Sequence, residues 1–271
     1  MAADAASDIL QVAALVAGGR AWPSQDDRAL VARGRASGQV AEPFKAFVLP
    51  MMDGLETLLG DPAAAMLDVG VGVGGLAVAF CRVFPRLRVV GLDVFPRALE
   101  LARRTVHEAG LADRVELRLQ DVAELEDQDA YCLAWVPAPF IPRPALDAGL
   151  SRVARALVPG GWVAVGHGKL GASGLQDALT RFRAVAFGGA AIDDGAAQEM
   201  LRRAGLERVA TLPTPEGAPG LTVGRRPRSG QADRVDRAAV ARSRPISARP
   251  SAARPSGRGT RRPRRGTDPD R

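Results

Sequence analysis

The residues with the clearest chemical potential lie in one short stretch, where an acid is followed by glycines at every second position. Asp68, Gly70, Gly72 and Gly74 stand in the sequence MLDVGVGVGG, directly after a run of aliphatic residues suited to a buried strand. Glycine accepts positive φ and lets the backbone approach a ligand closely. The spacing therefore predicts a ligand-holding loop between a strand and a helix.

The same stretch can be read in a second way. With the spacing Gly70-x-Gly72-x-x-Gly75, and with Asp93 at the end of the next predicted strand, it satisfies the dinucleotide fingerprint. A nicotinamide cofactor is therefore one candidate ligand. Another interpretation is a turn that serves only the close packing of strand and helix. These residues alone do not identify the ligand, and other parts of the sequence are needed.

Strand and helix patterns alternate through the middle of the chain. The predicted strands are 64–69, 87–93, 114–121, 130–136, 160–167, 206–213 and 220–226. The predicted helices are 75–84, 96–109, 142–157, 173–187 and 194–204. This alternation predicts an α/β fold with a doubly wound parallel sheet. The last two strands are joined by a segment too short for a parallel crossover, so we expect an antiparallel hairpin there.

Residues 1–60 are predicted to be helical and to form a separate N-terminal region. One helix is capped by Ser7, a second covers 27–40, and a third covers 44–59 and is interrupted or kinked at Pro50. We expect this region to act as a lid over the ligand. The apolar residues that could cover it are Phe44, Phe47, Met51 and Met52, for which ordinary core packing is the alternative.

The C-terminal residues 227–271 are predicted to form a disordered basic tail. From Arg225 to Arg271 the chain has 15 arginines and four acids, with few large aliphatic residues, so it cannot bury enough apolar surface to fold. The whole chain carries a net charge of +7, but residues 1–224 alone carry −4. A mildly acidic body disfavours a nucleic-acid partner, apart from weak contact through the tail.

The composition also bears on redox chemistry and location. Cys81 and Cys132 stand in apolar segments and indicate neither a disulfide framework nor a metal site. The acidic start of the chain does not resemble a signal peptide, and no apolar run approaches the ~20 residues of a membrane span. We therefore expect a cytoplasmic protein without a membrane partner.

From Asp68 to Gly74, the acid and its three alternating glycines resemble the motif of the class I S-adenosylmethionine-dependent methyltransferases. The stretches VVGLDVFPRALELAR, VELRLQDVAEL and LSRVARALVPGGWVAVG are similar to later motifs of that family. The resemblance covers residues 61–226. It implies a Rossmann-like sheet of seven strands, in which the antiparallel seventh strand lies between the fifth and the sixth.

The resemblance also implies a cofactor, S-adenosylmethionine, and a set of residues that hold it. Asp68 agrees with this cofactor, because a carboxylate attracts its sulfonium and ammonium groups but would repel a dinucleotide's diphosphate. Asp93 would grip the ribose hydroxyls, with Val94 beside the adenine. The full set of cofactor-binding residues is Asp68, Gly70, Gly72, Gly74, Asp93, Val94, Asp121, Val122 and Trp135.

The implied reaction is methyl transfer to a small molecule, at an oxygen or a nitrogen atom. Residues 136–140 read VPAPF, at the position where amine and amide methylases of the family frequently have Asn-Pro-Pro-aromatic. The missing Asn argues against DNA or protein glutamine as acceptor. His167, at the ligand-binding edge of the fifth strand, is a candidate general base, although it could instead bond the backbone.

Two other functions remain open on the sequence alone. The first is a methyltransferase-like fold that binds without catalysis, or that contacts RNA through its tail. The second is a nicotinamide-dependent oxidoreductase, which the sequence supports less because Tyr131 is its one tyrosine and no Tyr-Lys pair is evident.

Overall fold

The computed structural model describes residues 27–170, 174–215 and 218–228. The chain divides into two units, Met1–Ala232 and Asp233–Arg271, and every described residue belongs to the first. The helix predicted from Ser7 and the predicted tail beyond residue 228 lie outside the described residues. The domain boundaries expected after residues 60 and 226 stay a prediction.

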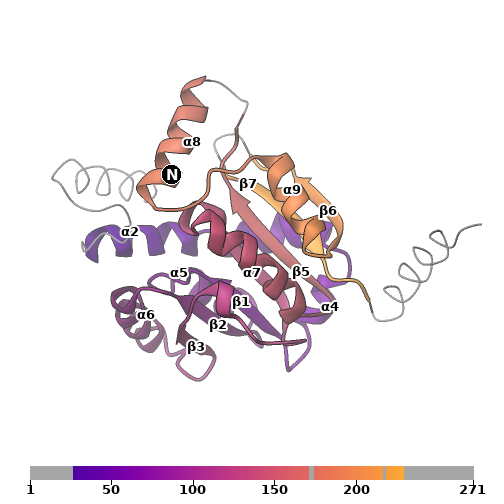
Figure 1. Ribbon diagram of the computed structural model, residues 1–271. Coiled ribbons are helices and arrows are strands. Elements are labelled where there is room, and N and C mark those ends of the chain that lie inside the picture. The colour runs from indigo at the N-terminus through magenta and orange to yellow at the C-terminus, as the bar shows by residue number, and fades with distance from the viewer. Residues whose placement is uncertain (1–26, 171–173, 216–217, 229–271) are drawn as a thin grey trace, which may run out of the picture. The chain divides into compact units, whose positions relative to one another are not determined.

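Seven strands form a sheet in the order β3-β2-β1-β4-β5-β7-β6 (Figure 1). The strands are β1 (Ala65–Val69), β2 (Arg88–Asp93), β3 (Val115–Leu119), β4 (Tyr131–Pro137), β5 (Leu157–His167), β6 (Glu207–Leu212) and β7 (Gly220–Arg225). Strands β1 to β5 pair in parallel, and β7 runs antiparallel to both β5 and β6. The prediction of a doubly wound sheet with a terminal antiparallel hairpin is confirmed.

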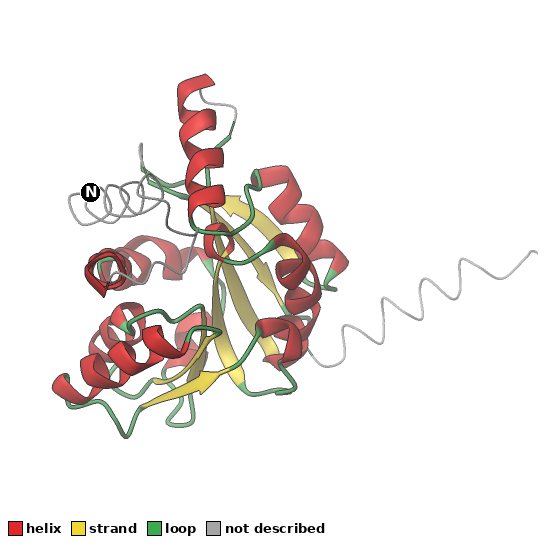
Figure 2. Ribbon diagram, turned by 60° about the vertical axis from the view of Figure 1, so that its left-hand side comes forward, coloured by secondary structure: helices red, strands yellow, loops and turns green. Residues whose placement is uncertain are grey.

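The central strands are mostly apolar because both faces of the sheet are covered. Successive side chains of a strand point to opposite faces. In β1, Met66 therefore belongs to one buried cluster with Phe80 and Leu99, while Leu67 belongs to a second cluster with Leu150 and Leu201. Figure 2 shows the sheet between two groups of helices.

The α-helices follow the predicted pattern closely. They are α2 (Asp27–Gly38), α3 (Ala41–Pro43), α4 (Leu55–Leu59), α5 (Gly75–Val83), α6 (Pro96–Glu108), α7 (Arg143–Ala156), α8 (Gly174–Ala186) and α9 (Asp194–Arg203). Short 3₁₀ turns also occur, among them η3 (Val122–Glu124) and η4 (Ala138–Phe140). Within the described ranges, we find no helix with the length and apolarity needed to cross a lipid bilayer.

The helix predicted over 44–59 is divided into shorter pieces. A π-helical turn, η1 (Phe44–Val48), passes into a 3₁₀ turn, η2 (Leu49–Met51), before α4 begins. Pro50 has no N–H to donate to a preceding carbonyl, and Gly54 has a φ of +80°, outside the helical range. The helix is therefore interrupted near Pro50, which is one of the two outcomes predicted there.

Candidate functional site

The glycine stretch forms the turn between β1 and α5, as its spacing predicts. Gly70 and Gly72 have φ values of +66° and +57°, in a region that residues with a Cβ rarely adopt. The turn is tied to the end of β2, because the N–H of Val71 donates to the carbonyl of Leu92 at 2.8 Å. These residues bring the carboxyl ends of two neighbouring parallel strands together, where open α/β sheets bind ligands.

Asp68 is buried in this turn region, with 2% of its surface exposed. Its Oδ2 atom has no hydrogen-bond partner among the described residues. Burial, and secondarily the nearby charge of Asp93, raises the pKa of Asp68 to about 8. A buried carboxyl group with an unsatisfied oxygen is unfavourable by itself and is suited to a cationic ligand.

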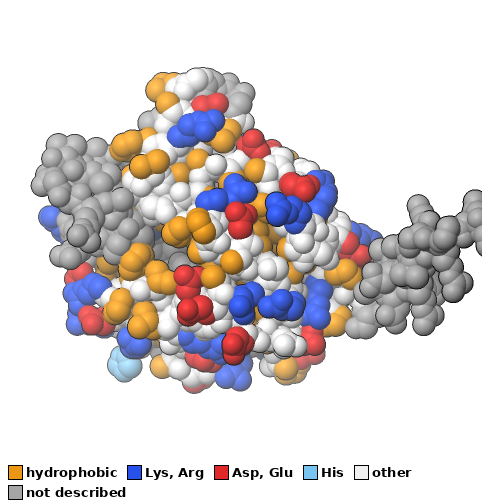
Figure 3. Space-filling model, viewed as in Figure 1, with side chains coloured by type: hydrophobic (Ala, Val, Ile, Leu, Met, Phe, Trp, Pro, Cys, Tyr) orange, Lys and Arg blue, Asp and Glu red, His pale blue; other side chains and the backbone are white. Residues whose placement is uncertain are grey.

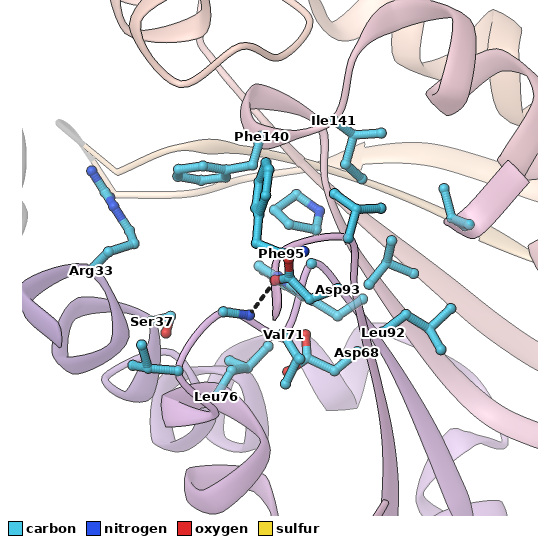
Figure 4. Close-up of a pocket in the computed structure, with 18 of the residues that line it drawn as sticks. Arg33, Ser37, Asp68, Val71, Leu76, Leu92, Asp93, Phe95, Phe140 and Ile141 are labelled. Atoms are coloured by element: carbon cyan, nitrogen blue, oxygen red, sulfur yellow. Dashed lines mark hydrogen bonds between the residues drawn. The ribbon is translucent and has the colours of Figure 1, made fainter. Parts of the chain in front are cut away.

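Asp93 is held in a fixed orientation at the end of β2. The N–H of Gly72 donates to its Oδ2 atom at 2.8 Å, and the N–H of Phe95 donates to its Oδ1 atom at 2.9 Å (Figure 4). Burial raises the pKa of Asp93, although these backbone donors oppose the shift. Each oxygen accepts one backbone bond and keeps further lone-pair capacity for the hydroxyl groups of a ligand.

The end of β3 supplies the third acid. Oδ1 of Asp121 accepts a hydrogen bond from the N–H of Ala123 at 2.8 Å and caps the turn η3. Val122, the next residue, is buried beside it. The ends of β1, β2 and β3 therefore each present one carboxylate to the same region.

One pocket collects nearly all of the residues predicted to bind the cofactor. The predicted residues among its lining are Asp68, Gly70, Gly72, Asp93, Val94, Asp121, Val122 and Trp135. Gly74 is not part of the lining. Its φ of +80° favours glycine, whereas a Cβ at Gly74 would meet Val106 and Ala102 only at ordinary contact distances of 3.5 Å and 3.6 Å.

The pocket is completed by residues outside the predicted cofactor-binding set. They come from α2, from the segment after β2, and from the segment after β4, where the resemblance had already drawn attention to residues 136–140. They include Leu30, Arg33, Gly34, Ser37, Phe95, Phe140 and Ile141. Helix α2 comes very near the glycine turn, since a Cβ at Gly34 would lie 2.1 Å from Cγ2 of Val73. A glycine in the middle of a predicted helix was the one local signal of this contact.

The residues expected to form the lid do not line the pocket. Phe44 is 1% exposed and packs in the core against Phe80, with ring centroids 5.2 Å apart. Phe47 is 72% exposed on the surface, and Met52 is buried. These side chains lie on the segment after α2, whereas α2 itself, which belongs to the same predicted region 1–60, lines the pocket. A lid formed by residues 1–60 stays a prediction.

His167 is also placed differently from the expectation of a general base. It is 1% exposed and is absent from the pocket lining. Its Nδ1 atom lies 2.9 Å from the carbonyl oxygen of Gly168, and its Nε2 atom lies 2.8 Å from Oγ1 of Thr222. Because the carbonyl only accepts, Nδ1 donates to it. Nε2 links β5 to β7, whereas Nδ1 contacts the residue after β5 and lies 3.8 Å from Oδ1 of Asp194 on α9.

Fold and site together define a Rossmann-like methyltransferase domain, and comparison with known sequences agrees. Residues 66–161 match the family model described as "Methyltransferase domain". The release factor glutamine methyltransferase of Cereibacter sphaeroides is 31% identical over 197 residues, which are 66% of this chain and 66% of that protein. The ribosomal RNA small subunit methyltransferase H of Kineococcus radiotolerans is 37% identical over 99 residues, 36% of this chain and 23% of that protein. The chain thus spans only part of the length of these curated relatives.

Solved structures show the same fold. The S-adenosylmethionine-dependent methyltransferase SibL in its apo form has a TM-score of 0.58 at 26% identity, covering 82% of this chain and 70% of that chain. An O-methyltransferase family protein from Burkholderia thailandensis has a TM-score of 0.58 at 20% identity, covering 76% of this chain and 61% of that chain. The chain belongs to the class I S-adenosylmethionine-dependent methyltransferases, a class whose cofactor is S-adenosylmethionine.

Proposed function

We propose that this protein transfers a methyl group from S-adenosylmethionine to a small-molecule acceptor, at an oxygen or a nitrogen atom. The observation that carries the proposal is one continuous pocket. It runs from the carboxylates at the ends of β1, β2 and β3 to the side chains of α2 and of the segment after β4. We call the part lined by Asp68, Asp93 and Asp121 the donor half, and the part lined by α2 and the segment after β4 the acceptor half.

The donor half fits S-adenosylmethionine. The unpartnered Oδ2 atom of Asp68 suits the positive charge of the cofactor, and the oxygens of Asp93 suit the ribose hydroxyls. Asp121 and Val122 stand where the adenine edge would lie, with Val94 and Trp135 in the same lining. Gly70 and Gly72 leave room for close approach of the ligand. When bound, the cofactor supplies an already activated methyl group.

The chain's own contribution is then to position the acceptor and to exclude water. Among the described residues that line the pocket, the titratable side chains are Arg33, Asp68, Asp93 and Asp121. Three of these belong to the donor half, and His167 lies elsewhere. This arrangement favours an acceptor that needs little help from a general base, such as an amine or an already ionised oxygen.

The surface and the pocket lining favour a small acceptor over a macromolecule. Among the described residues on the face shown in Figure 3, Lys and Arg side chains are interspersed with Asp and Glu and form no continuous basic patch. The segment after β4 presents Pro137 and Phe140 to the pocket, where amide methylases of the family frequently have an Asn. The relatives named for release factor glutamine and ribosomal RNA make those two acceptors the alternatives to be tested.

The first experiment measures the donor. S-adenosylmethionine at about 100 times its dissociation constant should stabilise the protein by ~2.7 kcal/mol, or roughly 5–11 °C in Tm, whereas NAD should not. Asp93→Ala should lose most of this shift, because the ribose hydroxyls lose their charged acceptor. Asp113→Ala, an exposed acid outside the pocket, is the matched control. A shift with NAD in place of S-adenosylmethionine would contradict the assignment.

The second experiment identifies the acceptor class. The full chain is incubated with methyl-labelled S-adenosylmethionine and separated small-molecule, protein and RNA fractions of a cell extract. We expect label in the small-molecule fraction with the wild type and none with Asp93→Ala. Label confined to protein or RNA would reject the small-molecule acceptor while leaving the methyltransferase activity in place.

A further inference from the structure

A second group of charged side chains lies outside the pocket, where β7 ends. Arg225, the last residue of β7, pairs with Trp162 of β5 and with Glu207 of β6. Gly220, the first residue of β7, pairs with His167 at the carboxyl end of β5. The carboxyl ends of the parallel strands hold the pocket, so Arg225 lies toward the opposite end of the sheet. It is absent from the pocket lining.

The guanidinium of Arg225 is buried with one donor edge unsatisfied. Its side chain is 3% exposed, and its Nε and Nη2 atoms have no hydrogen-bond partner in the part of the chain that the structure describes. Its Nη1 atom lies 3.7 Å from Oδ2 of Asp53, an ion pair longer than a hydrogen bond. Nε and Nη2 together form the side-on fork that binds two oxygens of one oxyanion. Because a buried donor without a partner is destabilising, this edge is suited to an anionic ligand.

A second guanidinium, that of Arg228, lies beside this edge. A Cβ added at Gly160 would lie 3.5 Å both from Nη2 of Arg225 and from Nε of Arg228, so the two side chains meet over this glycine. A Cβ added at Gly54 would lie 2.9 Å from Nη2 of Arg228. The side chain of Arg228 therefore extends from Gly160 to Gly54. It is exposed, and its contacts with the other described residues include neither a hydrogen bond nor an ion pair.

A third arginine, Arg208 of β6, points to the same acid as Arg225. Its Nη1 atom lies 3.8 Å from Oδ2 of Asp53, and its φ is +50° at a register shift between β6 and β7. Such a bulge re-aims a side chain. Among the described residues, the acids whose charges act on Arg225 are Glu207 and Asp53. Burial lowers the pKa of Arg225, and the charge of Arg228 lowers it further. Three guanidiniums beside two carboxylates leave a net positive charge.

We propose that Arg225 and Arg228 bind a phosphate group, and that Arg208 adds to the positive potential of the site. The site is separate from the pocket and goes beyond the proposed methyl transfer. Two oxygens of the phosphate accept from Nε and Nη2 of Arg225. A third accepts from Arg228, whose exposed side chain turns outward to admit the group. A phosphate suits the site better than a carboxylate because it has enough oxygens and charge for both guanidiniums. Inorganic phosphate and phosphomonoesters share this chemistry.

The test measures binding to the full chain by calorimetry, at an ionic strength held constant with chloride. The probes are inorganic phosphate and glycerol phosphate, with acetate as the carboxylate for comparison. We expect inorganic phosphate to bind at least about tenfold more tightly than acetate, because it engages both guanidiniums. Glycerol phosphate should bind as well if the site takes monoesters, and should fail to bind if it takes the free ion alone. Equal affinity for phosphate and acetate, or no binding of phosphate, would overturn the proposal.

Variants separate this site from the arginine-rich residues 229–271. Arg225→Met removes the fork and fills its buried position with an apolar side chain, so phosphate affinity should fall at least about tenfold. Arg228→Gln should lower it at least about threefold, since an exposed charge contributes less. The controls are Arg258→Gln in the C-terminal residues and Arg104→Gln at an exposed position on α6, and neither should change the affinity. If Arg225→Met fails to fold, the exposed Arg228→Gln decides. Undiminished affinity in either folded variant would overturn the proposal.

Nuclear magnetic resonance of the full chain with isotope-labelled arginine gives a readout at the site itself. The Nε–H signal that is missing from Arg225→Met identifies Arg225. We expect this signal to shift as phosphate is added, and to saturate at the phosphate concentration that calorimetry indicates. A signal that stays in place while phosphate binds would locate the binding elsewhere in the chain and refute the site.

Discussion

Within the pocket, the carboxyl group of Asp68 is buried and its Oδ2 atom lacks a partner among the described residues. Burial without compensation destabilises a charged group, and this explains why the pKa of Asp68 is raised to about 8. In the unfolded chain an aspartate titrates near pKa ~3.9. Between these two values the folded chain binds the proton more tightly, so ionisation of Asp68 increasingly opposes folding as the pH rises.

We therefore predict that Asp68→Asn stabilises the protein free of cofactor, and more so at pH 8 than at pH 5. The amide has no charge to bury, so the penalty that grows through this pH window disappears. The gain at pH 8 should be of the order of 1–3 kcal/mol. Urea unfolding at the two pH values measures it. The same variant should lose most of its affinity for S-adenosylmethionine, and a variant that is destabilised at both pH values would contradict this account.

The position of His167 in the sequence suggests a general base, whereas its position in the structure is that of a buried, hydrogen-bonded side chain. It ends β5 as predicted, but its ring is held between Gly168 and Thr222, and Oγ1 of Thr222 lies 2.9 Å from Oγ1 of Thr211. The contacts of Thr222 with His167 and with Thr211 connect β5, β7 and β6. The side chain has no access to the acceptor half of the pocket.

We predict that His167→Ala lowers the free energy of unfolding by roughly 2–4 kcal/mol, because a buried ring and two hydrogen bonds are lost. Below the melting transition, turnover at saturating substrate should stay within about twofold of the wild type. His107→Ala, at an exposed position on α6, is the control and should change neither quantity. A large loss of turnover in a folded His167→Ala protein would restore the role of general base.

At the scale of elements, the contact between α2 and the glycine turn shapes the pocket. A Cβ at Gly34 would lie 2.1 Å from Cγ2 of Val73, and a Cβ at Gly75 would lie 2.0 Å from the carbonyl oxygen of Gly34. Glycines on both sides therefore allow the helix to approach the turn. This approach brings Arg33 and Ser37 to the pocket.

Gly34→Ala should destabilise the protein by about 1–3 kcal/mol, since the added methyl group forces α2 away from Val73. Helix propensity alone predicts the opposite sign, a gain of about 1 kcal/mol. The affinity for S-adenosylhomocysteine should fall in parallel. Gly174→Ala is the matched control, because this glycine begins α8 and has no atom within 4 Å of an added Cβ. The Tm from thermal unfolding and the affinity from calorimetry are compared for the two variants. A Gly34→Ala protein that is more stable than the wild type would show that helix propensity outweighs the steric contact with Val73.

At the scale of the whole molecule, charge is distributed unevenly along the chain. Residues 225–271 hold 15 arginines, whereas residues 1–224 carry a net charge of −4. The sheet is complete at Arg225, where β7 ends. Folding of the body and binding of the cofactor therefore should not depend on residues 229–271.

A chain truncated after Arg228 should melt within about 2 °C of the full chain and bind S-adenosylhomocysteine with the same affinity. The composition of residues 229–271 offers too few large aliphatic side chains to add a packed core. Differential scanning calorimetry of both proteins, at the same salt concentration, tests this. A clear fall in Tm or in affinity would show that residues 229–271 pack on the body.

The sequence by itself determined the sheet and the donor half of the pocket. Buried strands, glycine turns and helix ends depend on consecutive residues and can be recognised locally. Examples are the strand that contains Asp68, the acid Asp93 at the end of β2, and the short loop before β7. Once parallel strands are recognised, their carboxyl ends must meet at one edge. The three carboxylates of the donor half follow from this rule.

Only the tertiary structure decided which residues close the pocket and which are buried away from it. Arg33, Phe140 and Phe187 come from three distant segments, and their contact depends on how α2, η4 and the end of α8 pack. Phe44 and His167 are buried because other elements of the fold pack around them. The periodicity of apolar residues predicts which face of a helix or strand is buried, and the order of strands predicts which residues lie at the edge of the sheet. Neither shows which partner covers a residue, because packing depends on shapes contributed by the whole fold.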